Sequence, residues 1–570
     1  MDVVLVGLPG SGKTAVGKRL AGRHHATFVD LDDLVERQSG MSVPTIFETE
    51  GEAGFRRRER EAVISLGPAD PNPELRRVIA TGGGTIIDPR NRWLLYRGRF
   101  SVWLDGSPDV LAGRLLRSAN VRPLVAGRDP VGTLRQLAAD RRRFYAPALQ
   151  ISGASHVEAI LRAIEARLGD GVSPAVTVLR ADTAIGRVEI GHGIAAEAVA
   201  EALTRGEARR AILLAEPRSW EVAGSGIARA LSEGGWPVER ILLPGGEDAK
   251  RMHVVESVCR DLARLNVDRR ETLVAIGGGA LTDAAGFVAA TYLRGVAIVQ
   301  VPTTLVGQVD AALGGKTAVD IPEGKNLVGA FHQPVAFIAD VSFNATLPVR
   351  QRRAALGEVV KMAVLGDERL LELVEEDGEA YARGDSEPIE SGAVAEMVER
   401  CVWAKVEVVT ADAHDAGVRT TLNLGHTLGH GIEAAAGYES IMHGEAVAYG
   451  LRGAFAIALA MNLTSAARAD RVNSLLDRLG LGIEPPAVTR GAVMEHVARD
   501  KKHATGRLNW VLPTDTGVVV RSDVPPEARC RARADPGGRS LGWPELRWSG
   551  SSPGRWRRRR AGRRPRLRRA

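Results

Sequence analysis

Two histidines lie four residues apart in the segment TLNLGHTLGHGIE, residues 421–433. This segment is predicted to be helical, and in a helix the side chains at positions i and i+4 project from one face. A pair such as His426 and His430 is a typical beginning of a zinc site, with Glu433 or Glu445 to complete the set of ligands. The spacing therefore predicts a metal pair and leaves the third ligand open.

A second group of residues able to do chemistry lies near the N-terminus, where VVLVGLPGSGKTAVGKRLA indicates a strand, a glycine loop and an amphipathic helix. In this order, backbone N–H groups of the loop can surround phosphates, a lysine can reach the terminal phosphates, and a hydroxyl can bind Mg²⁺. The motif predicts that a nucleotide is bound by Gly10, Ser11, Gly12, Lys13 and Thr14.

Acidic residues follow the next apolar stretch, in FVDLDDLVE, which we interpret as a strand ending in Asp30-x-Asp32. Carboxylates at the C-terminal edge of a parallel strand face the same crevice as the glycine loop, where they can hold Mg²⁺ or a substrate hydroxyl. The alternative is a solvated acidic turn. Further along, IATGGGTII (79–87) predicts a strand that runs into glycines, where the backbone can approach a ligand closely.

Lysine is rare in this chain: of 76 basic residues, nine are Lys. In an arginine-rich sequence we expect Lys where a compact ammonium group is needed, whereas chance survival predicts lysines scattered over the surface. The stretches 244–250 and 309–326 place Lys250, Lys316 and Lys325 beside glycine turns. There the ammonium groups can contact phosphate or ribose.

Length and composition set the frame for these motifs. A chain of 570 residues predicts at least two domains, and 44% hydrophobic with 25% charged residues is ordinary for a globular protein. No apolar run approaches the ~18 residues of a membrane span. The segment MDVVLVG predicts a buried strand rather than a signal peptide, and three scattered cysteines suit a reducing cytosol. We therefore expect a cytoplasmic protein without a membrane partner.

The order of elements predicts an α/β fold in several parts. Residues 1–168 form a P-loop domain with a parallel sheet, closed by a helix over 156–169, and 169–176 form a linker. Strands and helices alternate over 177–345, which predicts a Rossmann-like α/β subdomain, and 346–524 predict an α-helical metal-binding subdomain. Residues 525–570 form an arginine-rich tail without helical or strand periodicity.

The first 168 residues resemble shikimate kinase, because the elements DxD, FRR, GGG, RPL and R-x-x-x-Y follow the P-loop in this order. The resemblance implies that Asp32 orients or deprotonates the attacking 3-hydroxyl, Asp30 acts through Mg²⁺, and Arg122 lies on a lid over ATP. A carboxylate substrate suits arginine forks, and phosphoryl transfer needs positioned positive charge. The resemblance further implies that shikimate is held by Asp32, Arg56, Gly82, Gly83, Gly84 and Arg141.

Residues 177–520 resemble 3-dehydroquinate synthase. The motifs GGGxxxD, VPTTLxxQVD, GGKTAVD, GKN, GEVVK, NLGHTLGHGIE, HGEAV and DKK occur in that order. This resemblance changes the interpretation of the histidine pair, because it implies that Glu358, His426 and His443 bind the metal. His430 then supports that group or contacts substrate, serving its phosphate or a proton transfer. Such a Glu-His-His site leaves positions open for two substrate hydroxyls on Zn²⁺ or Co²⁺.

The same resemblance assigns the remaining pocket residues. It implies a substrate pocket lined by Asp310, Lys316, Asn326, Lys361, Lys405, Arg419, Asn423 and His430. Arg294 would contact the substrate phosphate, either within its own subunit or from a partner subunit of a homodimer formed through the synthase region, and either Lys501 or Lys502 would close over the substrate. NAD would be held by Gly245, Gly246, Glu247, Asp248, Ala249, Lys250, Gly279, Ala280, Leu281, Thr282, Asp283, Thr303, Thr304, Lys316 and Lys325.

The implied reactions belong to aromatic biosynthesis: ATP-dependent phosphorylation of shikimate, and conversion of 3-deoxy-D-arabino-heptulosonate 7-phosphate to 3-dehydroquinate with NAD and a metal. NAD would oxidise the C5 alcohol, phosphate would leave by elimination, the hydride would return, and an aldol step would close the ring. A cluster of Lys, Arg and Asn suits a doubly anionic substrate. A different sugar phosphate cyclase is the alternative for this region.

The tail changes the meaning of the net charge of +7. Residues 526–570 hold fifteen Arg and three acidic residues, a net charge of +12, so the rest of the chain carries 7 − 12 = −5. One hypothesis is a basic arm that binds nucleic acid. A shifted reading frame is the interpretation we favour, because Arg, Gly, Pro and Trp are abundant there while Lys is missing.

Overall fold

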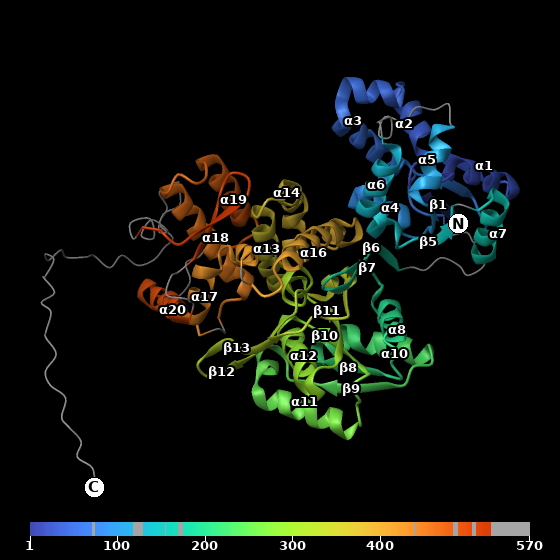
Figure 1. Cartoon of the computed structure of the whole chain (residues 1–570). Coiled ribbons are helices and arrows are strands. Elements are labelled where there is room, and N and C mark those ends of the chain that lie inside the picture. Colours follow the sequence, from blue (N-terminus) through green and yellow to red (C-terminus); the bar gives the residue numbers. More distant parts are fainter. Residues whose placement is uncertain are drawn as a thin grey trace, which may run out of the picture.

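The computed structural model describes residues 1–70, 74–117, 129–153, 155–168, 175–415, 417–437, 440–482, 488–503 and 509–525 (Figure 1). For residues 490 and 498–503 it describes the backbone alone. Arg122, most of the predicted linker and nearly all of the arginine-rich tail lie outside the described residues. No helix in the described part of the chain is long and apolar enough to cross a membrane.

A five-stranded parallel sheet forms the centre of the N-terminal region, in the order β2-β3-β1-β4-β5. The central strand β1, DVVLV, is buried at every position, as expected for a parallel strand covered on both faces. Its Val4 pairs with Ile79 on one side and Ser101 on the other. The strands are β1 Asp2–Val6, β2 Thr27–Asp30, β3 Arg77–Ala80, β4 Phe100–Asp105 and β5 Leu149–Ser152.

Helices surround this sheet. The first, α1, begins at Lys13 directly after the glycine loop, and α7 ends the region as the sequence predicts. A 3₁₀ turn, η1 (Thr85–Ile87), connects the three glycines to α4. The helices are α1 Lys13–Arg23, α2 Leu31–Ser39, α3 Val43–Ser65, α4 Pro89–Tyr96, α5 Pro108–Leu116, α6 Pro130–Tyr145 and α7 Val157–Leu168.

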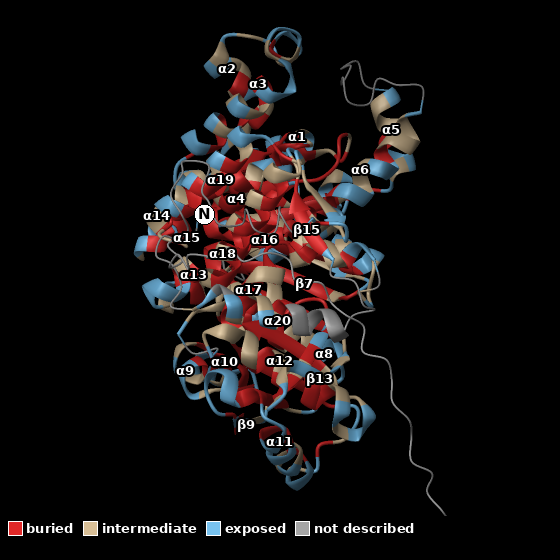
Figure 2. Ribbon diagram, turned by 90° about the vertical axis from the view of Figure 1, so that its left-hand side faces the viewer, coloured by how far each residue is buried: buried red, intermediate tan, exposed pale blue. Residues whose placement is uncertain are grey.

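A seven-stranded sheet forms the second α/β region, in the order β6-β7-β14-β11-β10-β8-β9. Its strands are parallel except for the hairpin of β6 and β7, and the sheet is mostly buried (Figure 2). The strands are β6 Val176–Thr183, β7 Gly186–His192, β8 Ala211–Ala215, β9 Val238–Leu242, β10 Thr272–Gly277, β11 Ala297–Pro302 and β14 Ala336–Asp340. Its helical segments are α8 Ala195–Arg205, α9 Pro217–Ser219, η3 Trp220–Gly224, α10 Ser225–Glu233, η4 Gly246–Lys250, α11 Met252–Arg264, α12 Gly279–Thr291, η5 Tyr292–Arg294, η6 Gly307–Ala311 and η7 Val341–Thr346.

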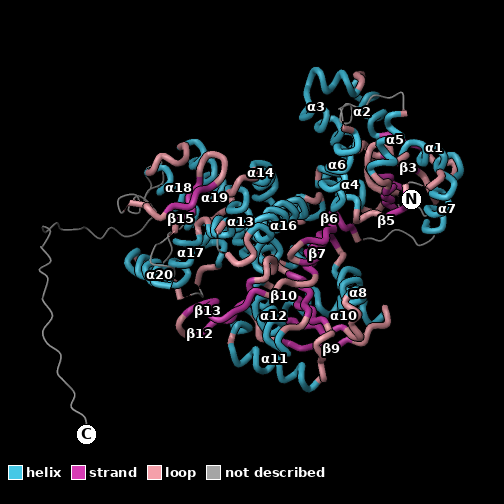
Figure 3. The backbone as a smooth tube through the Cα atoms, viewed as in Figure 1, coloured by secondary structure: helices cyan, strands magenta, loops and turns pink. Residues whose placement is uncertain are grey.

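The C-terminal part is mostly helical (Figure 3). A hairpin, β12 (Lys316–Ile321) and β13 (Gly324–Phe331), precedes it, and a short antiparallel pair, β15 (Trp510–Pro513) and β16 (Val518–Arg521), follows it. The helices are α13 Val349–Val364, α14 Glu368–Arg383, α15 Glu387–Glu390, α16 Ala393–Ala411, η8 Val418–Asn423, α17 His426–Ala435, α18 His443–Ala460, α19 Ala466–Arg478 and α20 Arg490–His503. The α/β fold with a parallel sheet and a helical C-terminal part is confirmed.

Two local predictions need correction. The helix predicted over 421–433 begins at His426, because η8 ends at Asn423 and Gly425 takes a left-handed conformation with φ 78°. Asp32 does not end the second strand, because that strand stops at Asp30. The Asp30 carboxylate accepts a hydrogen bond from the Asp32 backbone N–H at 3.2 Å and thereby caps α2, which places Asp32 in the first helical turn.

Candidate active sites

The glycine loop presents its lysine and threonine at the start of α1. Gly12 precedes the helix with φ 94°, a conformation that favours glycine. Lys13 is buried, and its Nζ donates hydrogen bonds to the carbonyls of Gly7 at 2.7 Å and Leu8 at 3.1 Å. Its positive charge is therefore held over the loop formed by Gly10, Ser11 and Gly12, where the N–H groups at a helix start can bind phosphate.

Thr14 and Asp30 form an oxygen pair beside this loop. The Thr14 hydroxyl donates a hydrogen bond to Asp30 Oδ2 at 2.9 Å. A hydroxyl and a carboxylate in contact are oxygen ligands of the kind that Mg²⁺ prefers. The strand end and the helix start therefore bring together the residues predicted to act through Mg²⁺.

The predicted shikimate residues converge on the three-glycine turn. A Cβ atom on Gly82 would lie 2.8 Å from Asp32 Oδ1, and one on Gly84 would lie 2.6 Å from Arg56 Nη2. Arg141 Nη1 donates a hydrogen bond to the carbonyl of Gly83 at 2.6 Å. The turn thus needs glycine because the carboxylate and the guanidinium groups approach the backbone so closely.

Glu59 was missed by sequence reasoning and lies inside this cluster. It is buried, accepts a hydrogen bond from Thr85 Oγ1 at 2.6 Å, and pairs with Arg56 Nη1 at 2.8 Å. Arg56 and Glu59 are three residues apart on α3, and that spacing within GFRRRE was the available signal.

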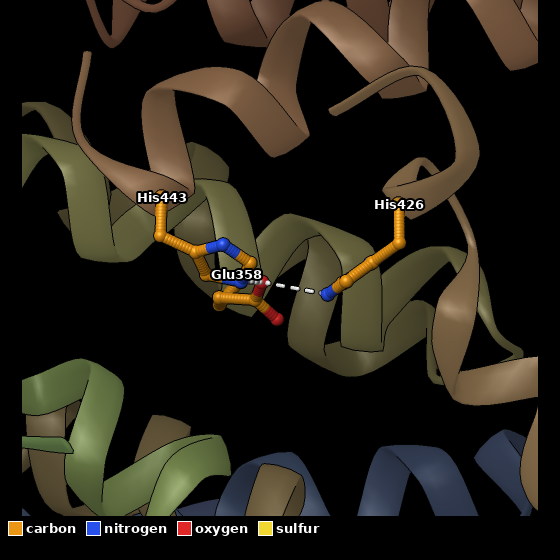
Figure 4. A group of neighbouring side chains, drawn as sticks. All are labelled: Glu358, His426 and His443. Atoms are coloured by element: carbon orange, nitrogen blue, oxygen red, sulfur yellow. Dashed lines mark ion pairs between the residues drawn. The ribbon is translucent and has the colours of Figure 1, made fainter. Parts of the chain in front are cut away.

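The second site gathers three residues from three helices. Glu358 on α13, His426 at the start of α17 and His443 at the start of α18 point toward one another (Figure 4). Glu358 Oε1 lies 3.1 Å from His443 Nε2 and 3.6 Å from His426 Nε2. One ligand atom of each residue lies within 4.8 Å of the others, a group able to hold a metal ion.

Glycines let these helices approach closely. A Cβ atom on Gly444 would lie 1.9 Å from the carbonyl oxygen of Ala354, and one on Gly357 would lie 2.2 Å from the carbonyl oxygen of Gly444. These contacts lie next to His443 and Glu358 in the sequence. Because Gly357 and Gly444 have no side chains, α13 and α18 can cross closely enough to bring the Glu358 carboxylate and the His443 imidazole together.

The buried carboxylate of Glu358 is suited to a cation. The side chain is fully buried, and neither oxygen accepts a well-aligned hydrogen bond, although Lys361 Nζ lies 2.6 Å from Oε2. Burial alone would raise the pKa of Glu358, but Lys361, His426 and His443 outweigh it and hold the pKa well below its usual range. The group is therefore an ionised oxygen ligand with free coordination capacity, and the donor set fits Zn²⁺ or a similar ion.

The two histidines differ in charge state. Burial lowers the pKa of His426 to about 3, so this imidazole is neutral. For His443, burial opposes the charge, but the nearby carboxylates of Glu358 and Glu433 outweigh it and raise the pKa to about 10. Without a metal, His443 is therefore protonated, and a cation that binds Nε2 must displace a proton from this nitrogen.

Both imidazoles are oriented through Nδ1. His426 Nδ1 lies 3.1 Å from the carbonyl oxygen of Leu424, and His443 Nδ1 lies 3.1 Å from Glu433 Oε2. Such partners fix which nitrogen faces the metal. Glu433 thus touches His443, whereas Glu445 pairs with Arg350 at 2.8 Å and caps α18, so the two glutamates left open by the sequence have different roles.

His430 is exposed and lies beside the group, with its ring centroid 5.1 Å from that of His426 and 6.0 Å from that of His443. It belongs to a second possible ligand group, formed with Glu433 and His443. Both groups include His443, so a given nitrogen of this imidazole can bind an ion in only one of them.

Cations and one aspartate line the inner side of the Glu358 group. Lys405 Nζ lies 2.6 Å from Asp310 Oδ1, and Lys361 Nζ lies 4.0 Å from Asp310 Oδ2. Burial lowers the pKa of Lys405. At Lys361, burial also opposes the charge, but the nearby carboxylates of Asp310 and Glu358 outweigh it and raise the pKa. Arg419 is buried and donates a hydrogen bond to the carbonyl of Gly314 at 2.8 Å.

The predicted NAD residues meet at the start of α12. Lys250 Nζ donates hydrogen bonds to Asp283 Oδ2 at 2.7 Å and to Asn326 Oδ1, and Lys325 pairs with Glu247 at 3.1 Å. Burial raises the pKa of Asp283 to about 6, against the opposing effect of Lys250. Thr303 and Thr304 follow β11 at the same edge of the sheet as Gly279, Ala280, Leu281 and Thr282, and η4 supplies Gly246, Glu247, Asp248 and Ala249 after Gly245.

Several predicted residues do not join these groups. Lys316 is half exposed and pairs with Asp415 at 2.5 Å, and Asn423 lies half-buried at the end of η8. Arg294 is exposed in η5 with φ 65°. Lys501 and Lys502 lie in α20, and their side chains, like Arg122, are outside the described residues.

Comparison with known families explains why the chain has two such sites. Residues 240–354 match the model for the N-terminal part of 3-dehydroquinate synthase, and residues 355–503 match its C-terminal part. Residues 9–165 match the model for shikimate kinase. The chain belongs to the 3-dehydroquinate synthase family. Its N-terminal region is a shikimate kinase domain, so the predicted fusion is confirmed; we call 9–165 the kinase domain and 240–503 the synthase domain.

Curated relatives and solved structures agree with the synthase family. The 3-dehydroquinate synthase of Pelobacter propionicus (strain DSM 2379) is 42% identical over 318 residues, which cover 56% of this chain and 87% of that protein. The structure of 2-epi-5-epi-valiolone synthase from Streptomyces hygroscopicus subsp. jinggangensis 5008, with NAD⁺ and Zn²⁺ bound, is 28% identical with a TM-score of 0.56 and covers 60% of this chain and 94% of that one. A 2-deoxy-scyllo-inosose synthase complexed with carbaglucose-6-phosphate, NAD⁺ and Co²⁺ is 26% identical, with a TM-score of 0.55 and coverage of 61% and 95%.

Proposed function

We propose that this chain catalyses two steps of aromatic biosynthesis, ATP-dependent 3-phosphorylation of shikimate and conversion of 3-deoxy-D-arabino-heptulosonate 7-phosphate to 3-dehydroquinate with release of phosphate. The observation that carries the second activity is the meeting of Glu358, His426 and His443 beside the buried cations of the synthase domain. The proposal includes the predicted boundaries 1–168, 177–345 and 346–524.

The metal would be held by the Glu358 carboxylate and by Nε2 of His426 and His443, because both Glu358 oxygens are buried without a well-aligned donor. NAD would lie against α12, between the glycine turn at Gly279 and the ammonium groups of Lys250 and Lys325. The metal would supply Lewis acidity toward a substrate hydroxyl, and NAD would supply reversible hydride transfer. Zn²⁺ and Co²⁺ are the ions bound by the two structural neighbours.

The residues of the synthase domain would bind and orient an anionic substrate. Lys405 and Arg419 offer buried positive charge that is already positioned by Asp310 and by the carbonyl of Gly314. Groups held in place before the reaction stabilise developing negative charge without further reorganisation. We assign Asn326, Asn423, Lys316 and His430 to the outer part of this pocket, with His430 near enough to hold or pass a proton.

In the kinase domain, Asp32 would accept the proton of the 3-hydroxyl as its oxygen attacks the γ-phosphorus of ATP and ADP leaves. Lys13 and Arg122 would neutralise charge on the transferred group, and Thr14 and Asp30 would hold Mg²⁺. Arg56 and Arg141 would fix the shikimate carboxylate against the three-glycine turn. We also propose a homodimer formed through the synthase domain, in which Arg294 faces the partner's substrate phosphate.

A related sugar phosphate cyclase is the second candidate for the synthase domain, because both structural neighbours above are synthases of other products and one of them is complexed with carbaglucose-6-phosphate. The relative named 3-dehydroquinate synthase has the higher identity, 42% against 28% and 26%, and this supports the first reading. Product identity separates the two candidates.

The test is phosphate release from 3-deoxy-D-arabino-heptulosonate 7-phosphate with NAD, with and without a chelator, alongside shikimate-dependent formation of ADP. Chelator-sensitive release that yields 3-dehydroquinate is expected from the full chain. A different carbocyclic product, or release that is insensitive to the chelator after exhaustive dialysis, would contradict the assignment.

A further inference from the structure

The kinase and synthase domains meet through buried ion pairs whose cations come from the kinase helix α4. Arg90 pairs with Asp377 on α14 at 2.6 Å and with Glu396 on α16 at 3.1 Å. Arg92, which is fully buried, pairs with Glu399 on α16. In Figure 1 the same helices, α4 and α16, lie side by side where the two domains meet, as their direct contacts require.

The packing of α4 against the synthase domain is close at one point and open at another. Trp93 Nε1 donates a hydrogen bond to the Glu390 carbonyl at 2.8 Å, and a Cβ atom on Gly392 would lie 2.5 Å from the Trp93 ring. Nearby, Pro89 at the start of α4 and Arg143 and Phe144 on α6 line a cavity of about 870 Å³ together with residues of α16. The Arg143 guanidinium lies 3.7 Å from the Trp403 ring centroid. The two domains are therefore in direct contact through α6 as well as through the ion pairs of α4.

Arg92 divides its hydrogen bonds between the two domains. Its Nη1 donates to the carbonyls of Ile86 at 2.5 Å and Ile87 at 2.9 Å, and its Nη2 donates to the carboxylate of Glu399. The guanidinium also lies 4.1 Å from the Phe144 ring centroid. The Glu399 carboxylate of the synthase domain thus neutralises the guanidinium that donates hydrogen bonds to two carbonyls of the kinase domain.

Those two carbonyls belong to the turn that follows the three glycines. Ile86 and Ile87 lie in η1, and Asn91 Nδ2 holds the preceding Thr85 carbonyl at 3.1 Å. The other side of the same turn carries the Gly83 carbonyl, which accepts a hydrogen bond from Arg141. Arg92 therefore holds the C-terminal end of the turn, whereas the glycine end of the turn contacts the predicted shikimate residues.

Loss of the Glu399 charge would leave the Arg92 guanidinium buried with neutral acceptors only. A buried charge without its counter-ion is strongly unfavourable, so the side chain would move toward water or recruit it. Either response pulls on the Ile86 and Ile87 carbonyls, and displacement of the three-glycine turn by a fraction of an ångström is enough to weaken a positioned substrate.

We propose that Glu399 of the synthase domain is a positioning residue for the kinase reaction, which it serves by anchoring Arg92 and through it the three-glycine turn. The inference rests on the proposed kinase function. It means that the kinase depends on a carboxylate from the fused enzyme, and that shikimate binding, rather than ATP binding at the glycine loop, carries this dependence.

The experiment compares the full-length chain with Glu399→Gln, measuring initial rates against shikimate and against ATP. We expect the KM for shikimate to rise about threefold to tenfold, within the range of couplings carried by packed networks, while the KM for ATP stays unchanged. Synthase activity in the same preparation reports that the domain carrying the substitution is folded. Glu379→Gln is the matched control, because Glu379 on α14 faces Arg478 at 3.1 Å rather than the kinase domain.

An unchanged KM for shikimate, or equal changes in both KM values accompanied by a lower melting temperature, would overturn the proposal. If Glu399→Gln does not fold, Glu399→Asp keeps the charge with a shorter reach, and the same ratio of KM values decides. A wild-type chain that forms no ADP with shikimate would defeat the proposed kinase function, whereas an active wild type with an unaltered variant would defeat this inference alone.

Discussion

Lys13 of the kinase domain is held by backbone carbonyls, whereas Lys361 and Lys405 of the synthase domain are held by buried carboxylates. In the first case the positioning groups lie within six residues of the lysine. In the second, Glu358 lies on the same helix as Lys361, and Asp310 approaches both Lys361 and Lys405 from η6, far away in the sequence. A loop that positions its own lysine can lose it with little effect on its surroundings. A buried network of charges cannot lose one member without unbalancing the others.

This difference predicts that Glu358→Gln has the largest effect. The amide is a poor metal ligand, and its loss of charge also leaves Lys361 without its nearest anion. Because residues that merely orient ligands already change metal affinity by about 10–100-fold, we expect synthase activity to fall by more than about a thousandfold. Steady-state assays of both reactions on one preparation measure this, and kinase activity should persist.

Lys13→Met sharpens the comparison from the other side. Loss of one positioned cation should lower the kinase kcat by about 10²–10³, with little change in melting temperature, because the Lys13 ammonium group donates to two carbonyls of its own loop, those of Gly7 and Leu8. Activity and thermal unfolding measured together test this. A large drop in stability would show that the loop depends on its lysine as the synthase site depends on its charges.

The two glutamates that the sequence left open provide a matched pair. Glu433→Gln removes the charge that orients His443, and we expect metal affinity to fall by about 10–100-fold. Glu445→Gln instead removes the charge that pairs with Arg350 and leaves an amide that can still cap α18, so stability should fall slightly while metal affinity does not. Competition with a metal-sensitive dye measures both, and equal losses of affinity would contradict the different roles.

The smallest expected effect is the release of a proton when the metal binds. With the pKa of His443 raised to about 10 and that of His426 lowered to about 3, His443 is an imidazolium and His426 a neutral imidazole at pH 7.5 in the metal-free protein. Metal binding should therefore release about one proton in a weakly buffered titration. Because the folded pKa of His443 is raised, its contribution to metal-free stability is complete below about pH 6.5 and is lost as the pH rises toward 10.

Much of this could be predicted from the sequence, and the rest has physical reasons. The glycine loop could be predicted because its functional residues are consecutive in the sequence and form the site locally. The spacing of His426 and His430 was not sufficient, because helical spacing shows which side chains share a face but not which other helix packs against that face. The crossing of α13 and α18 through Gly357 and Gly444 brings Glu358 to His443, and this contact is tertiary.

The same limit applies to the boundary between the domains. The sequence of α4 places Arg90 and Arg92 beside Trp93 but does not indicate which residues they contact. Its partners, Asp377, Glu396 and Glu399, lie 287 to 307 residues away in the sequence, on other helices. Burial of these pairs depends on how two complete domains meet, and no local pattern encodes that.

The central claim is the identity of the metal ligands, and anomalous diffraction from crystals of the zinc-loaded full chain tests it most directly. We predict one peak bound by Glu358, His426 and Nε2 of His443. A peak bound instead by His430, Glu433 and His443, the overlapping group in the structure, would contradict this ligand set.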